Sequence, residues 1–190
     1  RWTFRAMLLL AIAFALLLHA PGLAGEFNIF DDFRQIHWEE HVNTWSWEGF
    51  WYLISGNYKG ANQNLMYASF QANWAIAGKT YWVWYLFNLG GLALLTALVG
   101  WIALRTVGDR TTAALAAALF AATPIVSELM CWMSARSHLL GLLFTLLAFA
   151  TWLEYRRSRR WWAWLVLSVV AFALSQLCKP VFIILPVWLV

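Results

Sequence analysis

Charged residues are scarce in this chain of 190 residues, because Asp, Glu, Lys and Arg make up only 12% of it. A typical soluble domain carries about 25%, so the composition excludes an ordinary cytosolic enzyme. Cysteine is also scarce: Cys131 and Cys178 form no C-x-x-C or metal-ligand spacing, so neither a zinc site nor a disulfide framework is predicted. Repeats of fixed period and low-complexity linkers are missing too, which favours a single domain.

Apolar and aromatic residues are abundant instead, with 63% hydrophobic residues, 15 Trp and 13 Phe. About 20 consecutive apolar residues cross a bilayer as a helix, and aromatic rings gather at the two membrane interfaces. The sequence therefore predicts a multi-span membrane protein whose surroundings are the lipid bilayer. The net charge of +4 is then explained by basic residues at the ends of the spans, where they determine membrane topology. No nucleic acid is therefore expected as a partner.

The apolar runs predict an all-α membrane protein, a polytopic helical bundle of one domain with a long first outer loop over residues 25–80. The apolar stretch 112–153 has only two charges near its middle and suits two spans joined by a very short turn, with a break at Thr123–Pro124. The predicted spans are about residues 6–23, 82–104, 112–129, 137–153, 161–177 and 181–190, the last one truncated.

The start of the chain allows two interpretations. Arg1 and Arg5 precede the first apolar run and small residues follow it, as in a secretory signal peptide. Because everything downstream is membrane-embedded as well, an uncleaved first span is the preferred prediction. The chain begins with Arg1 and not with Met, and it stops inside an apolar run, so we expect it to be the N-terminal part of a longer protein.

Basic residues near the span ends predict the orientation. With a cytoplasmic N-terminus, eight of the thirteen Lys and Arg residues fall on the cytoplasmic side. Six of the nine acidic residues then lie in the loop 25–80, outside, in the periplasm, the cell exterior or a lumen. Segment 44–54 of this loop predicts an interfacial helix along the membrane surface, although a helix that packs over the spans without touching lipid fits equally well. Its apolar side chains share one helical side: Trp47, Phe50, Trp51 and Ile54.

Two adjacent carboxylates, Asp31 and Asp32, lie about seven residues beyond the first span. Neighbouring residues of an extended segment point to opposite sides, so one carboxylate is expected to face a reaction centre while the other anchors backbone or a cation. Phe30 and Phe33 flank the pair and are expected to restrict water around it. A solvated turn is the alternative. Two carboxylates are too few ligands to predict a divalent metal, and no cofactor is expected.

Further ionisable residues stand at the ends of later spans. Glu128, Trp132 and Arg136 have i, i+4, i+8 spacing and would share one face of a continuous helix, with His138 two residues on. Charges at membrane depth are usually paired or functional, so this predicts either a structural ion pair or an anion site in which Arg136 holds a phosphate. Lys179, at the outer end of the fifth span, either snorkels to headgroups or joins Arg136 as a second phosphate contact.

Three sequence blocks in this order resemble the GT-C superfamily of polytopic glycosyltransferases, and within it the transmembrane and tetratricopeptide-repeat O-mannosyltransferase-like proteins. Asn88 in the second span also fits, whereas Thr123 and Tyr85 stand where that family often has His. The blocks are residues 28–32 with 45–50, residues 122–136 with Leu139, and residues 174–180 with Leu185–Pro186. The tetratricopeptide repeats that the resemblance implies would lie beyond these 190 residues.

The resemblance implies a membrane glycosyltransferase that moves a sugar from a polyprenyl-phosphate donor to a hydroxyl of a protein or glycan acceptor on the outer face, by an inverting displacement. Protein O-mannosylation is one such reaction. The base on the acceptor hydroxyl would be Asp31, with Asp32 as second choice. The substrate-binding residues would be Arg136 and Lys179 as phosphate contacts, Glu128 to orient Arg136, and His138.

Two functions without catalysis are the alternatives. A transporter or lipid-binding scaffold shares the helical arrangement, but a transporter is expected to place polar residues at the membrane midplane in broken helices. Here the charged candidates all fall at one outer face, which favours chemistry at the surface. An assembly or anchor subunit is the third hypothesis, and it predicts that Asp31 is dispensable.

Overall fold

The structure is a computed structural model that describes residues 3–55, 63–158 and 161–185. Within these ranges the regular elements are helices and no strand occurs, which confirms the all-α prediction. In chain order they are α1 (Phe4–His19), η1 (Ala20–Ala24), η2 (Phe33–His37), α2 (Glu40–Asn43), α3 (Trp47–Ile54), α4 (Asn64–Ala77), α5 (Tyr81–Val107), α6 (Arg110–Ala121), α7 (Pro124–Cys131), η3 (Met133–Ala135), α8 (Arg136–Arg157), α9 (Trp161–Cys178) and η4 (Pro180–Ile184).

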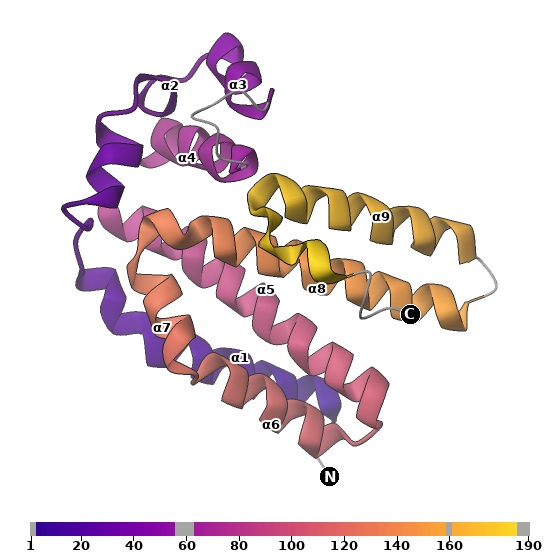
Figure 1. Cartoon of the computed structure of the whole chain (residues 1–190). Helices are drawn as coiled ribbons and strands as arrows, with labels where there is room; N and C mark the ends of the chain where they lie inside the picture. Colours follow the sequence, from indigo (N-terminus) through magenta and orange to yellow (C-terminus); the bar gives the residue numbers. More distant parts are fainter. Residues whose placement is uncertain (1–2, 56–62, 159–160, 186–190) are drawn as a thin grey trace.

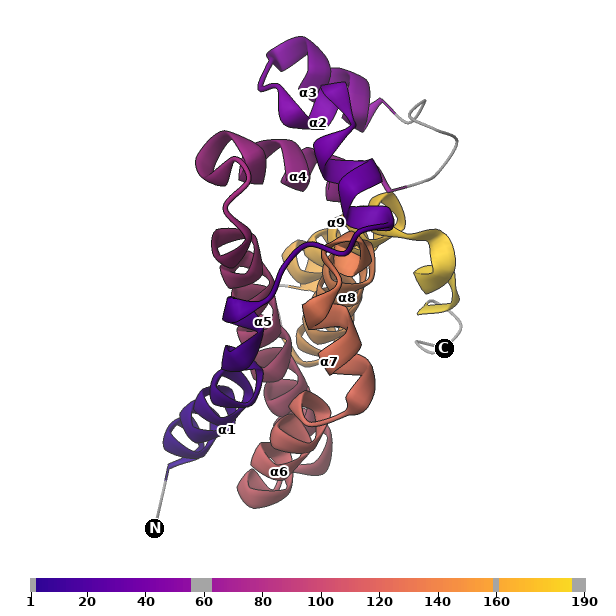
Figure 2. The same cartoon turned by 90° about the vertical axis from the view of Figure 1, so that its left-hand side faces the viewer.

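The long helices form a bundle that carries a small lobe at one end (Figures 1 and 2). α1, α5 and α6 pack along one another, α8 lies against α5, and α9 returns along α8 as the second arm of an antiparallel hairpin. α2, α3 and α4 pack on one another in the predicted outer loop. We call this part, residues 25–55 and 63–80, the outer lobe.

Three helical segments are long and apolar enough to cross a membrane: Phe4–Ala24, Tyr81–Val107 and Met133–Arg157. α6 and α7 form a fourth candidate that is bent by 51° at Thr123–Pro124, where proline lacks the N–H needed to continue the helix and favours an extended residue before it. The turn into α8 follows at residues 132–135. α9 is apolar but shorter. Of the predicted sixth span, residues 186–190 lie outside the described residues.

The two ends of the bundle differ in charge. The start of α1, the α5–α6 turn and the end of α8 lie at the end opposite the outer lobe (Figure 1). We call it the arginine end, because it carries Arg5, Arg105, Arg110, Arg156 and Arg157. Three more arginines expected there, Arg1, Arg159 and Arg160, lie outside the described residues. The described arginines of the predicted cytoplasmic side thus lie at one end of the bundle.

α3 confirms the helix predicted in the outer loop. The Ser46 Oγ accepts a hydrogen bond from the Gly49 N–H at 2.9 Å, which caps the first turn. Gly49 is buried, whereas Trp47 and Trp51 are 68% and 65% exposed. The helix therefore has one packed side and one exposed aromatic side, as an interfacial helix requires.

Gln71 of α4 ties the outer lobe together. Its side chain is fully buried, and Nε2 donates to the carbonyl oxygens of His41 at 3.0 Å and Thr44 at 3.1 Å. A Cβ at Gly49 would lie 2.9 Å from the same nitrogen. Glycine at this position therefore leaves room for the Gln71 side chain where α3 packs on α4.

A chain of hydrogen bonds joins three spans at the outer-lobe end. The Tyr85 hydroxyl donates to the carbonyl oxygen of His19 at 2.8 Å, and the His19 ring Nε2 lies 3.0 Å from the carbonyl oxygen of Ala121. All these groups are buried, where an unpaired polar group is costly. Tyr85, one of the departures from the family pattern, thus fixes the end of α1 against α5.

Candidate functional site

Asp32 of the outer lobe lies fully buried against the turn before α8. Its Oδ1 accepts hydrogen bonds from the backbone N–H of Ser134 at 2.8 Å and from the Ser134 hydroxyl at 2.7 Å. Its Oδ2 accepts from the N–H groups of Asn28 at 2.9 Å and Met133 at 3.4 Å. Hydrogen bonds to an ionised acceptor are about twice as strong as neutral ones. Asp32 therefore joins two segments that are 102 residues apart in sequence.

Asp31 has a different environment from its neighbour. Its carboxylate is 37% exposed and lies 3.5 Å from the guanidinium of Arg34, one turn further along. Phe30 is 83% exposed and does not enclose the pair, contrary to expectation, while Phe33 stacks on the His37 ring. Of the two carboxylates, Asp31 is thus the one open to a molecule from outside.

Arg136 is only 3% exposed and binds neutral groups. Nε donates to Asn88 Oδ1 at 2.9 Å, Nη1 to Asn73 Oδ1 at 2.9 Å, and Nη2 to the carbonyl oxygen of Trp84 at 3.2 Å. The guanidinium carbon also lies 5.0 Å from the ring centre of Phe70, a cation–π distance. Arg136 therefore connects α8 to α5 and to α4 of the outer lobe, and its fork points into the protein.

Glu128 does not share a helical face with Arg136. α7 ends at Cys131, and Trp132 has an extended backbone with φ −111° and ψ 104°, so the spacing that predicted the common face is interrupted. Glu128 is exposed, and the partners of Arg136 described above are amide and carbonyl oxygens. Glu128 was expected to orient Arg136, but in the structure the side chains of Asn73 and Asn88 bind the guanidinium.

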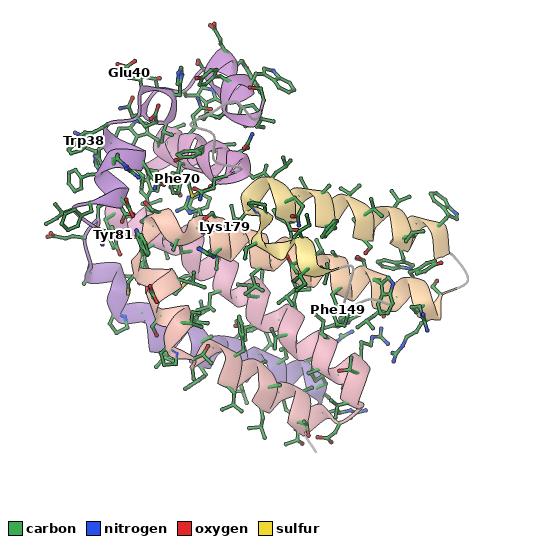
Figure 3. The ribbon with its side chains drawn as sticks, viewed as in Figure 1. Trp38, Glu40, Phe70, Tyr81, Phe149 and Lys179 are labelled. Atoms are coloured by element: carbon green, nitrogen blue, oxygen red, sulfur yellow. The ribbon has the colours of Figure 1, made fainter. Side chains whose placement is uncertain are left out.

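His138 and Lys179 are brought together by the α8–α9 hairpin. Lys179 Nζ lies 2.6 Å from His138 Nε2, both side chains being half-buried. In Figure 3 Lys179 lies at the end of α9 beside the first turns of α8. The Lys179 ammonium has three N–H donors and His138 accepts one, so further donors remain for an anion. Glu128 and His138 also line one pocket of about 450 Å³, whose other walls include Phe120, Ile125, Trp132, Leu142 and Val181.

The contact between Asp32 and Ser134 brings the carboxylate pair near the His138–Lys179 pair in space. Asp32 is fixed to Ser134, and His138 follows Ser134 by about one helical turn. With a rise of 1.5–2.0 Å per residue this separation is about 6–8 Å along the axis. A carboxylate, an imidazole and an ammonium group thus lie around the start of α8.

An aromatic cluster closes the junction between the outer lobe and α5. The ring of Phe27 contacts the rings of His37, Tyr81 and Trp84 with centroid distances of 4.9, 5.1 and 5.8 Å. Burial is the main cause that lowers the pKa of His37 below 6.5, and the charge of Lys79 acts in the same direction. The imidazole therefore stays neutral at physiological pH and serves as an aromatic packing group.

Several of these residues were not predicted from the sequence. No sequence pattern indicated Ser134 or Asn73, because their partners are distant in the chain. Asn88 could have been recognised, since an amide within an apolar span requires a hydrogen-bond partner. No group of three or more His, Cys, Asp or Glu side chains suited to a metal ion occurs in the part of the chain that the structure describes.

Comparison with known proteins identifies the family to which the chain belongs. No individual curated protein and no solved structure matches the chain. The family model for dolichyl-phosphate-mannose-protein mannosyltransferase matches residues 33–190, which is most of the chain. The match includes Glu128, Arg136, His138 and Lys179 and begins directly after Asp32. This multi-pass membrane protein therefore belongs to the dolichyl-phosphate-mannose-protein mannosyltransferase family of glycosyltransferases.

Proposed function

We propose that this protein transfers mannose from a polyprenyl-phosphate carrier to a hydroxyl group of an acceptor, a protein in the first instance, at the outer-lobe end of the bundle. Membership of the family supports the sugar and the class of donor. The side of the membrane on which the reaction occurs is supported by charge: most of the described arginines lie at the arginine end, and the positive-inside rule favours that end as the cytoplasmic one. The outer lobe then faces the periplasm, the cell exterior or a lumen.

The observation that carries the proposal is the division between the two carboxylates. Asp32 is held by four donors and fixes the loop, and Asp31 next to it is exposed to an incoming acceptor. A general base must reach the proton that it removes. We assign this role to Asp31 and the positioning of its segment to Asp32.

The proposed step is an inverting displacement. The acceptor oxygen forms a bond to C1 of mannose while the bond from C1 to the phosphate oxygen breaks, and the electron pair of that bond leaves with the lipid phosphate. Asp31 takes the acceptor proton. Lys179, with His138 as its partner, offsets the charge that develops on the phosphate, and the adjacent apolar pocket accepts the first isoprene units.

Arg136 contributes to the same site in a different way. Its donors are bound to Asn73, Asn88 and Trp84, so we assign it a positioning role rather than direct contact with phosphate. It holds the outer lobe on α5 and α8, and with it the segment that carries Asp31. Such a supporting layer keeps reacting groups in fixed geometry.

A transfer assay tests the proposal. Membranes with the full-length protein receive polyprenyl-phosphate mannose or a nucleotide-linked mannose, together with a peptide rich in Ser and Thr. We expect product only from the lipid donor, at least about 100-fold less with Asp31→Asn, and wild-type activity with the control Glu40→Gln, which removes an exposed acid of the same lobe. Lys179→Gln should raise the KM for the lipid donor about tenfold, whereas the control Lys79→Gln should not.

The proposal fails if folded wild-type protein uses the nucleotide sugar, or if Asp31→Asn retains full activity. Loss of the protein itself from the membrane in the Asp31 variant would assign that carboxylate to structure, which would also contradict the proposed role.

A further inference from the structure

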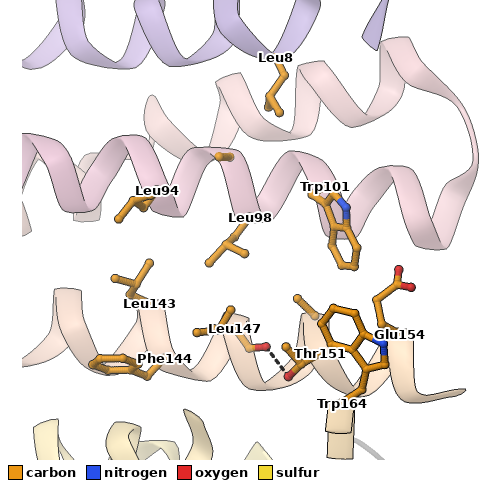
Figure 4. A pocket seen from close by; sticks show the side chains of 12 residues that line it. Leu8, Leu94, Leu98, Trp101, Leu143, Phe144, Leu147, Thr151, Glu154 and Trp164 are labelled. Carbon is orange, nitrogen blue, oxygen red and sulfur yellow. Dashed lines mark hydrogen bonds between the residues drawn. The ribbon is translucent and has the colours of Figure 1, made fainter. Parts of the chain in front are cut away.

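A second pocket lies far from the carboxylates, between α5 and α8 near the arginine end. Its volume is about 520 Å³, and its walls are almost entirely apolar. Figure 4 shows Leu94 and Leu98 of α5 facing Leu143 and Leu147 of α8 across it. An open apolar groove along two membrane-spanning helices is a surface that hydrocarbon chains fill.

The end of this groove carries aromatic and charged groups. Trp101, Glu154 and Trp164 lie together at the side where α5 and α8 finish (Figure 4). Arg105 lies over the Trp101 ring at 5.0 Å, and its Nη2 is 2.9 Å from Glu154 Oε1. Tryptophan at this depth is typical of the headgroup level of a bilayer.

Further arginines make this end of the groove positive. Arg157 Nη2 donates to the carbonyl oxygen of Arg105 at 2.6 Å, which brings a second guanidinium to the same place. Arg156, also exposed, lies over Trp152 on the adjacent turn of α8. Arg105 pairs with the carboxylate of Glu154, and Arg157 contacts the Arg105 backbone, so two arginines and one carboxylate leave an excess of positive charge at this end of the groove. Guanidinium groups bind phosphate oxygens in bidentate geometry.

We propose that this groove is a binding site for an anionic diacyl phospholipid of the leaflet at the arginine end, with its acyl chains along α5 and α8 and its phosphate at Arg157 and Arg105. Basic pockets between membrane helices bind anionic headgroups in this way. The charge at the groove mouth is what selects an anionic lipid over a zwitterionic one. The site lies at the end opposite Asp31, so it is independent of the proposed transfer reaction.

Native mass spectrometry of the purified full-length protein tests the proposal. The protein is delipidated in detergent and titrated with phosphatidylglycerol, phosphatidylcholine or polyprenyl phosphate. We expect one tightly bound phosphatidylglycerol and weaker binding of the other two. Arg157→Gln should weaken this binding about fivefold, whereas Arg110→Gln, which removes an equal charge from the start of α6 at the same end, should not.

A second variant separates the groove from surface charge. Leu98→Trp fills the groove without changing charge and should remove the bound phospholipid, with the unfolding temperature measured in parallel to confirm a folded protein. Equal binding of phosphatidylcholine, equal loss in Arg110→Gln, preference for polyprenyl phosphate, or retention of the lipid in folded Leu98→Trp would each overturn the proposal. Absence of any bound phospholipid in the wild type would do the same.

Discussion

Arg136 at the outer-lobe end and Arg105 at the arginine end have opposite environments. At the outer-lobe end Arg136 is buried, and its side-chain partners are Asn73 and Asn88, 63 and 48 residues away in sequence. At the arginine end Arg105 is 40% exposed and pairs with a carboxylate close to the surface. A buried charge in fixed hydrogen bonds costs desolvation but defines geometry. An exposed charge defines little geometry, but it can contact lipid headgroups and help to determine the orientation of the protein in the membrane. This difference agrees with the two proposals, transfer chemistry at the outer-lobe end and lipid binding at the arginine end.

The largest effect that this comparison predicts is on stability. Arg136→Met should lower the free energy of unfolding by about 3–5 kcal/mol, because Asn73, Asn88 and the Trp84 carbonyl lose a buried donor. Arg105→Met should cost at most about 1 kcal/mol, as for exposed ion pairs. Thermal unfolding of both purified variants in detergent checks this, and Arg136→Lys should fall between them. Equal losses for the two methionine variants would contradict the distinction between the ends.

A smaller effect is expected from single hydroxyl groups. Ser134→Ala removes one donor to the buried Asp32 carboxylate and should destabilise the protein by about 1.5 kcal/mol, the lower range for a hydrogen bond to a charged group. Thr106→Ala removes a hydroxyl that donates to carbonyl oxygens of its own exposed helix turn near the arginine end, and no measurable change is expected. Chemical denaturation of the two variants measures both quantities, and a larger loss for Thr106 would reverse the expected order.

The smallest predicted effect is a pH dependence of the outer-lobe end. Burial lowers the pKa of His37 below 6.5, so below this pH the unfolded chain takes up a proton that the folded protein resists. The contribution of His37 to the free energy of unfolding is therefore fully present above about pH 6.5, and it declines as the pH falls through that value. Unfolding temperatures between pH 5 and 8 should show the decline in the wild type and a smaller one in His37→Gln. An identical profile for both proteins would exclude the imidazole as its source.

The fold was largely predictable, because apolar runs alone indicate membrane helices. The predicted ranges 82–104 and 137–153 lie inside α5 and α8. The sequence also indicated that the ends of the spans differ in basic residues. These features depend on local composition, which a single sequence contains.

The candidate site was only partly predictable, because its contacts are distant in sequence. The sequence predicted different partners for Asp31 and Asp32, but which of the two is buried depends on Ser134, 102 residues from Asp32. Helical spacing placed Glu128 with Arg136, yet the extended backbone at Trp132 separates them. The contact between His138 and Lys179 arises from the α8–α9 hairpin. Tertiary contacts of this kind leave no periodic pattern in the chain.

The central claim is that the two neighbouring carboxylates have separate roles, and one paired measurement tests it most directly. Turnover with polyprenyl-phosphate mannose and the unfolding temperature are determined for Asp31→Asn and Asp32→Asn in the full-length protein. We expect Asp31→Asn to keep the wild-type unfolding temperature and lose turnover by at least about 100-fold, and Asp32→Asn to lower the unfolding temperature clearly. An active Asp31→Asn, or an Asp32→Asn of wild-type stability that has lost turnover, would contradict the account.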